Sequence, residues 1–217
     1  KKGDEFANAK NVLKQDQSVK SGKTVDEMNG GPPPKLEEYP KISKPWVVKP
    51  MLATLVDEVF DGDEWIFEVK WDGYRAIAAK HKDEIDLYSR NQTDFRDHYP
   101  AVVEAVRACK HDVIFDGEIV ILGDNGRPHF EWIQQYRQQP IGHLHYYAFD
   151  ILWCDGHDVR TMPLVERKKL LKSVLPEKNI VIRYGDYIEK TGTKLFGEMR
   201  RQGLEGIIAK KAQSDYT

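Results

Sequence analysis

A lysine at the end of an apolar strand is the residue in this sequence best placed to act as a nucleophile. The segment EVKWDGYR, residues 68–75, ends an alternating apolar run at Lys70 and then turns at once through Asp72 and Gly73. An apolar setting and a nearby cation such as Arg75 both disfavour the charged ammonium and favour the neutral amine. A neutral amine can attack an electrophile and form a covalent intermediate. The alternative is an ordinary lysine at a strand edge beside a turn.

Two carboxylates interrupt a second apolar strand, in the segment FDGEIVIL. Asp116 and Glu118 are two residues apart, so both project from the same face of that strand. A carboxylate in an apolar strand is costly unless it is paired with a cation or binds a metal ion or hydroxyl groups. A ligand site and an ion pair with a buried arginine or lysine therefore both remain open.

Three further segments carry groups that could bind a nucleotide. Glu205 and Lys210 flank a short apolar strand, although exposed charges at a helix-to-strand corner would give the same pattern. Phe149 could stack on a purine or could belong to the core. Arg90 ends a strand and has a guanidinium group that can bind phosphate or ribose oxygens with two parallel hydrogen bonds.

The elements that must position these residues are mostly strands. Apolar periodicity predicts strands over residues 65–71, 74–79, 85–90, 113–122, 144–153 and 206–211, and helices over 100–109, 163–175 and 194–202. Most connections are too short for parallel crossovers, so the pattern favours an α+β fold with antiparallel sheets. The basic segment 166–172 is interpreted as a solvated helix face.

Composition divides the chain into two parts. Residues 1–45 are polar and include Gly-Gly-Pro-Pro-Pro, which predicts an N-terminal extension or linker, whereas residues 46–217 are predicted to form one domain. The net charge of −2 argues weakly against nucleic-acid binding, but a local basic patch would be enough. No apolar run is long enough to predict a membrane-spanning helix, and two cysteines fit a cytoplasmic setting.

Taken in order, the chemical segments resemble the motif series of the covalent nucleotidyltransferase superfamily, which contains ligases and capping enzymes. EVKWDGYR resembles motif I, SRNQTDF motif Ia, FDGEIVIL motif III, YYAFDILW motif IIIa and EGIIAKK motif IV. Their order makes the match specific, and it covers residues 46–217. The resemblance implies an ATP-grasp-like α+β nucleotidyltransferase fold, with two antiparallel sheets flanked by helices and the nucleotide between them.

The resemblance also implies a role for each matched residue. Lys70 would attack the α-phosphorus of ATP and carry AMP, with Mg²⁺ or Mn²⁺ as the divalent ion. The resemblance implies that Glu68 contacts adenine, that Phe149 stacks on the base, and that Arg75 and Arg90 hold ribose and phosphate. It further implies that Glu118 binds ribose or the metal ion, that Glu205 binds the metal ion, and that Lys210 binds the nucleotide.

The first residues carry a second resemblance. Residues 1–28, with DEFANAK and QSVKSGKTVDEM, resemble the stretch that follows the phosphoesterase module in bacterial end-joining ligases of the LigD type. This implies a larger, cytoplasmic and nucleoid-associated bacterial enzyme that repairs nicked or broken double-stranded DNA by non-homologous end joining, with Ku as a partner. The leading hypothesis is thus the adenylation domain of an ATP-dependent DNA ligase. An RNA ligase, a GTP-using capping enzyme and a disabled DNA-binding module remain as alternatives.

The family pattern continues beyond motif IV to a pair of lysines, motif V, and then to an OB-fold domain. This chain ends at Thr217, before either. The resemblance implies that motif V contacts the phosphates and that the OB-fold domain closes over ATP and grips DNA. Residues 46–217 are therefore expected to be an adenylation domain truncated at its C-terminal end, and to seal nicks poorly alone.

Overall fold

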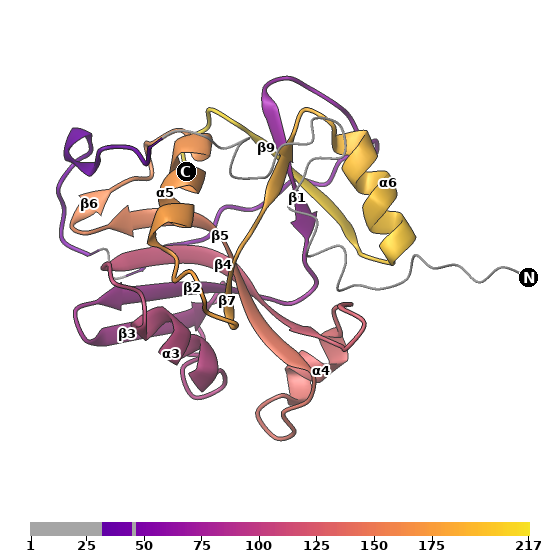
Figure 1. Ribbon diagram of the computed structural model, residues 1–217, viewed down its shortest axis with the longest axis horizontal. Coiled ribbons are helices and arrows are strands. Elements are labelled where there is room, and N and C mark those ends of the chain that lie inside the picture. Colours follow the sequence, from indigo (N-terminus) through magenta and orange to yellow (C-terminus); the bar gives the residue numbers. More distant parts are fainter. Residues whose placement is uncertain (1–31, 45–46) are drawn as a thin grey trace, which may run out of the picture.

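The computed structural model describes residues 32–44 and 47–217 (Figure 1). The segment 1–28, with its resemblance to end-joining ligases, lies outside the described residues. The elements follow one another as η1 (Leu36–Glu38), β1 (Trp65–Lys70), β2 (Tyr74–His81), β3 (Glu84–Ser89), α3 (Pro100–Arg107), β4 (Val113–Leu122), α4 (Phe130–Gln135), β5 (His143–Cys154), β6 (His157–Asp158), α5 (Leu164–Val174), β7 (Ile182–Tyr184), β8 (Tyr187–Glu189), α6 (Gly192–Gln202) and β9 (Gly206–Lys211).

The larger sheet has six strands in the order β3-β2-β4-β5-β6, with β7 also paired to β5. Every pair is antiparallel except β5 with β7, which is parallel. Strand β4 lies at the centre and is buried along both faces. Glu118 is the one position of β4 that is not fully buried.

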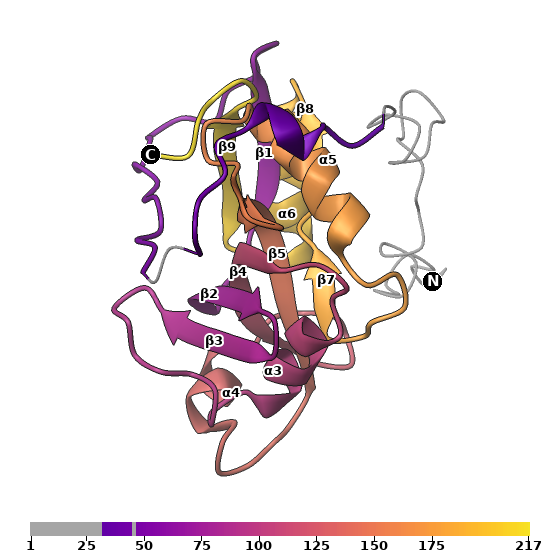
Figure 2. The same ribbon diagram turned by 90° about the vertical axis from the view of Figure 1, so that its left-hand side faces the viewer.

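The smaller sheet has three antiparallel strands in the order β8-β1-β9. Its register places Glu68 opposite Ile208 and Lys70 opposite Gly206. Only Trp71-Asp72-Gly73 separates β1 from β2, so the chain passes from one sheet to the other immediately after Lys70. Figure 2 shows the smaller sheet above the larger one, with α5 beside both. This arrangement places the end of β1 at the junction of the two sheets.

Two glycines allow the backbone to pack closely around the predicted site. A Cβ atom on Gly73 would overlap the carbonyl oxygen of Ile119 on β4. A Cβ atom on Gly117 would lie 2.6 Å from the ring of Tyr146. Only glycine fits such close approaches, so packing requires the Asp-Gly pairs beside Lys70 and within β4.

Helix α5 corrects one prediction from the sequence. The basic segment 166–172 was interpreted as a solvated helix face, yet Arg167 is 1% exposed and Lys168 is fully buried. Each has a buried carboxylate partner, Asp150 for Arg167 and Glu68 for Lys168. The prediction is wrong at these two positions because paired charges can occupy the apolar stripe of a helix.

Residues 32–44 pack against the larger sheet, from β6 at one edge to β3 at the other. The backbone N–H of Ile42 donates to the carbonyl of Gly156 at 2.8 Å, and Trp153 Nε1 donates to the carbonyl of Ile42 at 3.2 Å. Lys44 is 6% exposed and lies 2.6 Å from a carboxylate oxygen of Asp86. The described end of the predicted extension therefore contacts the domain that follows it.

The strands and helices predicted from periodicity are all present, and the fold is the predicted α+β class. The additional elements η1, α4, β6, β7 and β8 were not predicted, and each has six residues or fewer. No helix in the described part of the chain combines the length and apolar character needed to span a bilayer.

Candidate active site

A cavity of about 730 Å³ lies where the two sheets meet. This volume is typical of a small-molecule binding site. The structure brings together every site residue predicted from the sequence, and all of them line this cavity: Glu68, Lys70, Arg75, Arg90, Glu118, Phe149, Glu205 and Lys210.

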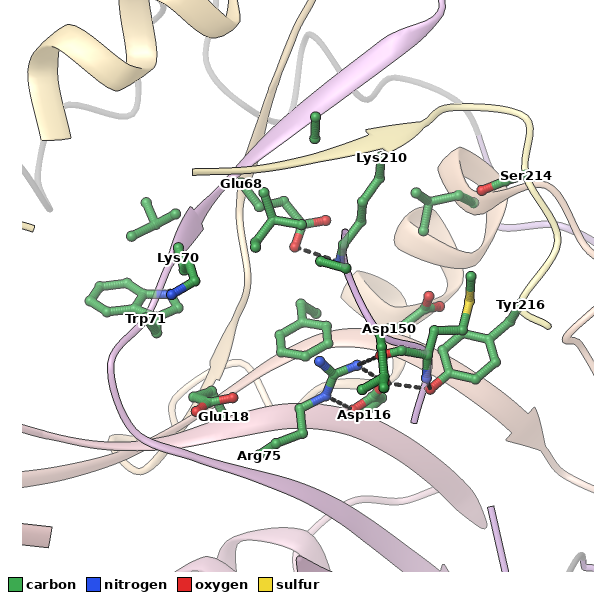
Figure 3. Close-up of a pocket in the computed structure, with 18 of the residues that line it drawn as sticks. Glu68, Lys70, Trp71, Arg75, Asp116, Glu118, Asp150, Lys210, Ser214 and Tyr216 are labelled. Carbon is green, nitrogen blue, oxygen red and sulfur yellow. Dashed lines mark hydrogen bonds and ion pairs between the residues drawn. The ribbon is translucent and has the colours of Figure 1, made fainter. Parts of the chain in front are cut away.

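Lys70 ends β1 at the cavity, beside Trp71 (Figure 3). Its amine contacts the carboxylate of Glu205, which immediately precedes β9. The Lys70 side chain is 42% exposed, so the apolar setting predicted from the strand pattern is wrong. Trp71, the next residue, stacks on Tyr147 with ring centroids 4.0 Å apart.

Arg75 is held by a diagonal ion pair across β2 and β4. It lies directly opposite Glu118, but its guanidinium group contacts both oxygens of Asp116, at 2.5 and 2.6 Å. Tyr216 donates its hydroxyl to the same carboxylate at 2.6 Å. Burial alone would lower the pKa of Arg75, but Asp116 outweighs it and raises that pKa above its ordinary value. Asp116 is thus the partner of a partly buried arginine, so an ion pair, one of the two alternatives left open by the sequence, is present at this position.

Glu118 has the other environment. Among the described residues, no hydrogen bond or ion pair reaches its carboxylate. Burial, and then the negative charges of Asp116 and Asp72, raise its pKa to about 8, although Arg75 and Lys70 act in the opposite direction. A bound cation would stabilise the ionised form of this carboxyl group, which its surroundings otherwise disfavour. Glu118 and Glu205 supply hard oxygen donors at the cavity, so the residues present fit Mg²⁺ or Mn²⁺.

Glu118→Gln is expected to stabilise the ligand-free protein at alkaline pH. The carboxyl titrates near pH 8 when folded, against a reference value of 4.5. Folding stability is therefore lost as the pH rises from 4.5 to about 8, because the unfolded chain ionises first. In the presence of a chelator at pH 9, the variant should melt about 5 °C higher than the wild type, with no difference at pH 4.

The exposed Glu131→Gln on α4 is the control and should leave the melting temperature unchanged at both pH values. An equal effect of Glu118→Gln on the melting temperature at pH 4 and pH 9 would show that ionisation of Glu118 does not destabilise the folded protein.

Glu68 is buried between two lysines. Lys168 Nζ lies 2.8 Å from one of its carboxylate oxygens and Lys210 Nζ lies 2.8 Å from the other. The Lys210 ammonium also lies 4.4 Å above the centre of the Phe149 ring, and the Arg75 guanidinium lies 4.6 Å from that centre. Two cations therefore lie against the one aromatic ring of Phe149 in the cavity.

Two residues of this site were missed in the sequence. Lys168 is four residues after Leu164 and three before Leu171, so it falls on the apolar stripe of α5, and that position was its signal. Tyr216 packs in a buried cluster with Val48 and Trp153 and donates to Asp116. Nothing in the pattern around Tyr216 indicated this role.

Two antiparallel sheets that meet at a cavity carrying a strand-end lysine define the class of this protein as a nucleotidyltransferase domain. The family model for the ATP dependent DNA ligase domain matches residues 50–217. The chain belongs to the ATP-dependent DNA ligase domain family.

Relatives and solved structures agree with this family. The chain is 31% identical to the SPbeta prophage-derived DNA ligase-like protein LigB of Bacillus subtilis, over 78% of this chain and 62% of that protein. It is 30% identical to the multifunctional non-homologous end joining protein LigD of Mycolicibacterium smegmatis, over 81% of this chain and 23% of that protein. A mycobacterial DNA ligase D complexed with ATP and MES superposes with a TM-score of 0.67 at 30% identity, over 78% of this chain and 56% of that one. The chain therefore spans less than two thirds of these proteins.

Proposed function

We propose that this chain is the adenylation domain of an ATP-dependent DNA ligase and that Lys70 carries AMP as a covalent intermediate. The observation that supports this most directly is the convergence of all the motif residues on one cavity, with the Lys70 amine at its edge. Residues 46–217 would form the domain and residues 1–45 an extension before it.

Each wall of the cavity has a proposed task. Phe149 would stack on the adenine ring, and Glu68 would accept a hydrogen bond from the adenine amino group. Arg75 and Arg90 would bind ribose and phosphate oxygens, for which guanidinium groups are well suited. Lys210 would add a further positive charge near the nucleotide.

A divalent cation would be held by Glu118 and Glu205, and when bound it would neutralise charge on the phosphates. Mg²⁺ or Mn²⁺ fits these carboxylates. Glu205 also contacts the Lys70 amine. The amine must lose its proton before it attacks, because an ammonium group has no lone pair.

The proposed reaction begins with a bond from Lys70 Nζ to the α-phosphorus of ATP. The bond from that phosphorus to the bridging oxygen breaks, pyrophosphate leaves and the amine loses its proton. AMP then passes from Lys70 to the 5′-phosphate of a nick. Attack by the 3′-hydroxyl releases AMP and joins the strand. The protein's contribution is to align the nucleophile and to stabilise the charge that develops on the phosphates.

The proposed substrate is nicked or broken double-stranded DNA, and the proposed setting is repair by non-homologous end joining at the nucleoid. Relatives named for this process support it. A larger end-joining assembly that includes Ku is the proposed partner.

Intact-mass measurement tests the activity. The protein should gain the mass of one AMP after incubation with ATP and Mg²⁺, gain nothing with GTP, and lose AMP again with pyrophosphate. The charged protein should then transfer AMP to a nicked DNA duplex and not to a nicked RNA duplex. A GMP adduct would move the assignment to the capping branch, transfer to RNA would indicate an RNA ligase, and no adduct at all would count against the proposed activity of this chain.

A further inference from the structure

Lys168 is a buried cation behind the cavity rather than a residue that lines it. It lies on α5 and its side chain is 0% exposed. Its ammonium lies 2.8 Å from Glu68 Oε1 and donates a hydrogen bond to the carbonyl of Gly185 at 2.8 Å. A lysine so enclosed has little freedom to leave its carboxylate partner.

The second cation on Glu68 is placed differently. Lys210 belongs to the cavity wall, is 23% exposed, and donates to Glu68 Oε2 at 2.8 Å (Figure 3). It also lies over the Phe149 ring, at 4.4 Å from the ring centre. A purine stacked on that face of Phe149 would need the space that Lys210 occupies. Binding of the base would therefore displace Lys210 and leave Lys168 as the cation on Glu68.

The charge on Glu68 decides which base it can recognise. An ionised carboxylate only accepts hydrogen bonds, whereas a protonated carboxyl can also donate one. Adenine presents an amino group at the position where guanine and hypoxanthine present a carbonyl oxygen. Glu68 Oε2 is the oxygen that Lys210 contacts at the cavity wall, so displacement of Lys210 would leave Oε2 as an acceptor for a ligand amino group.

Burial and the two lysines act on Glu68 in opposite directions. Burial alone would raise the pKa of Glu68, but Lys168 and then Lys210 outweigh it and hold the pKa below its ordinary value. Once Lys210 has moved, the buried Lys168 is the remaining close counter-charge.

We propose that Lys168 is a positioning residue that sets base preference by keeping Glu68 an ionised acceptor for the adenine amino group while Lys210 is displaced. This inference rests on the proposed nucleotide site and assigns a determinant of its specificity. Lys168 itself touches no nucleotide.

The test compares binding of three nucleotides by calorimetry, without a divalent ion so that no reaction occurs. They are ATP, purine riboside triphosphate, which lacks the amino group, and inosine triphosphate, which has a carbonyl there. The wild type should bind ATP at least about tenfold more tightly than purine riboside triphosphate. Lys168→Met should reduce this preference to within about threefold. It should also raise the affinity for inosine triphosphate relative to the affinity for ATP.

Two matched variants separate positioning from packing. Lys168→Arg keeps a cation and should retain the preference for ATP. Lys169→Met removes the neighbouring lysine of the same helix, which pairs with Glu166, and should also retain it. If Lys168→Met does not fold, Lys168→Gln removes the charge while keeping a donor for the Gly185 carbonyl.

The outcomes distinguish this inference from the proposed function. An unchanged ATP preference in the uncharged variants Lys168→Met and Lys168→Gln, or an equal loss of affinity for all three nucleotides, would overturn the role of Lys168. A wild type with no preference for ATP would instead overturn the proposed contact of Glu68 with the base. Failure to form an AMP adduct despite selective ATP binding would count against the proposed reaction alone.

Discussion

Lys70→Ala is expected to abolish the AMP adduct formed from ATP. The amine of Lys70 is the proposed nucleophile, and alanine leaves no group on β1 that can form a phosphoramidate. Lys210 and Lys211 also line the cavity, but they lie opposite Ile66 and Trp65, four and five residues along β1 from Lys70. Intact mass after incubation with ATP and Mg²⁺ should remain that of the unmodified chain.

The exposure of Lys70 and a control variant separate loss of the nucleophile from loss of folding. Lys70 is 42% exposed and its ion pair with Glu205 is open to solvent, so its loss should cost at most about 1 kcal/mol of stability. Lys194→Ala, at an exposed position of α6, should form the adduct at the wild-type rate. An AMP adduct on the Lys70→Ala protein would overturn the assignment of the nucleophile.

Asp116→Asn is expected to give the largest loss of stability among single changes at the site. Asp116 is fully buried, binds the Arg75 guanidinium through both oxygens and accepts the hydroxyl of Tyr216. The variant leaves the arginine without its counter-charge in a largely buried position, which costs about 3–5 kcal/mol. The melting temperature should fall by about 10 °C, and ATP binding should weaken because Arg75 loses its fixed orientation.

Asp94→Asn is the matched control, because Asp94 forms the same kind of two-oxygen pair with Arg96 on the surface. Both side chains of that pair are more than half exposed, so its loss should cost less than about 1 kcal/mol. Similar losses of stability in the two variants would show that the burial of Asp116 contributes nothing.

The sequence predicted the long elements and not the short ones. Strands such as β4 and β5 span ten and twelve residues, long enough for alternation or a sustained apolar run to be recognised. Strands β7 and β8 have three residues each, too few for any period, and their pairing depends on partners distant in the chain. The parallel pairing of β7 with β5 is likewise a tertiary feature that no local pattern contains.

At the site, the residues could be predicted from the sequence but the contacts between them could not. The motif residues could be predicted because each stands in a characteristic local setting, and the structure places them around one cavity. Their pairings could not be predicted. Arg75 pairs with the diagonal Asp116 and not with the directly opposite Glu118, and Asp116 also accepts from Tyr216, which is 100 residues away. Lys168 was overlooked because a basic run normally indicates solvent, and only the buried carboxylate of Glu68 reverses that expectation.

The pairing register of β1 determines both the packing of the core and the position of the reactive lysine. Phe67 is fully buried and packs against Gly192 at the start of α6, while its neighbour Glu68 and then Lys70 enter the cavity. A slip of one residue in pairing would exchange the two faces, removing Phe67 from the core and Lys70 from the cavity together. Mutations that erode the register are therefore eliminated as folding defects before they can produce a stable but inactive descendant. Packing therefore fixes the register of β1, but it does not fix the lysine itself, whose side chain is 42% exposed.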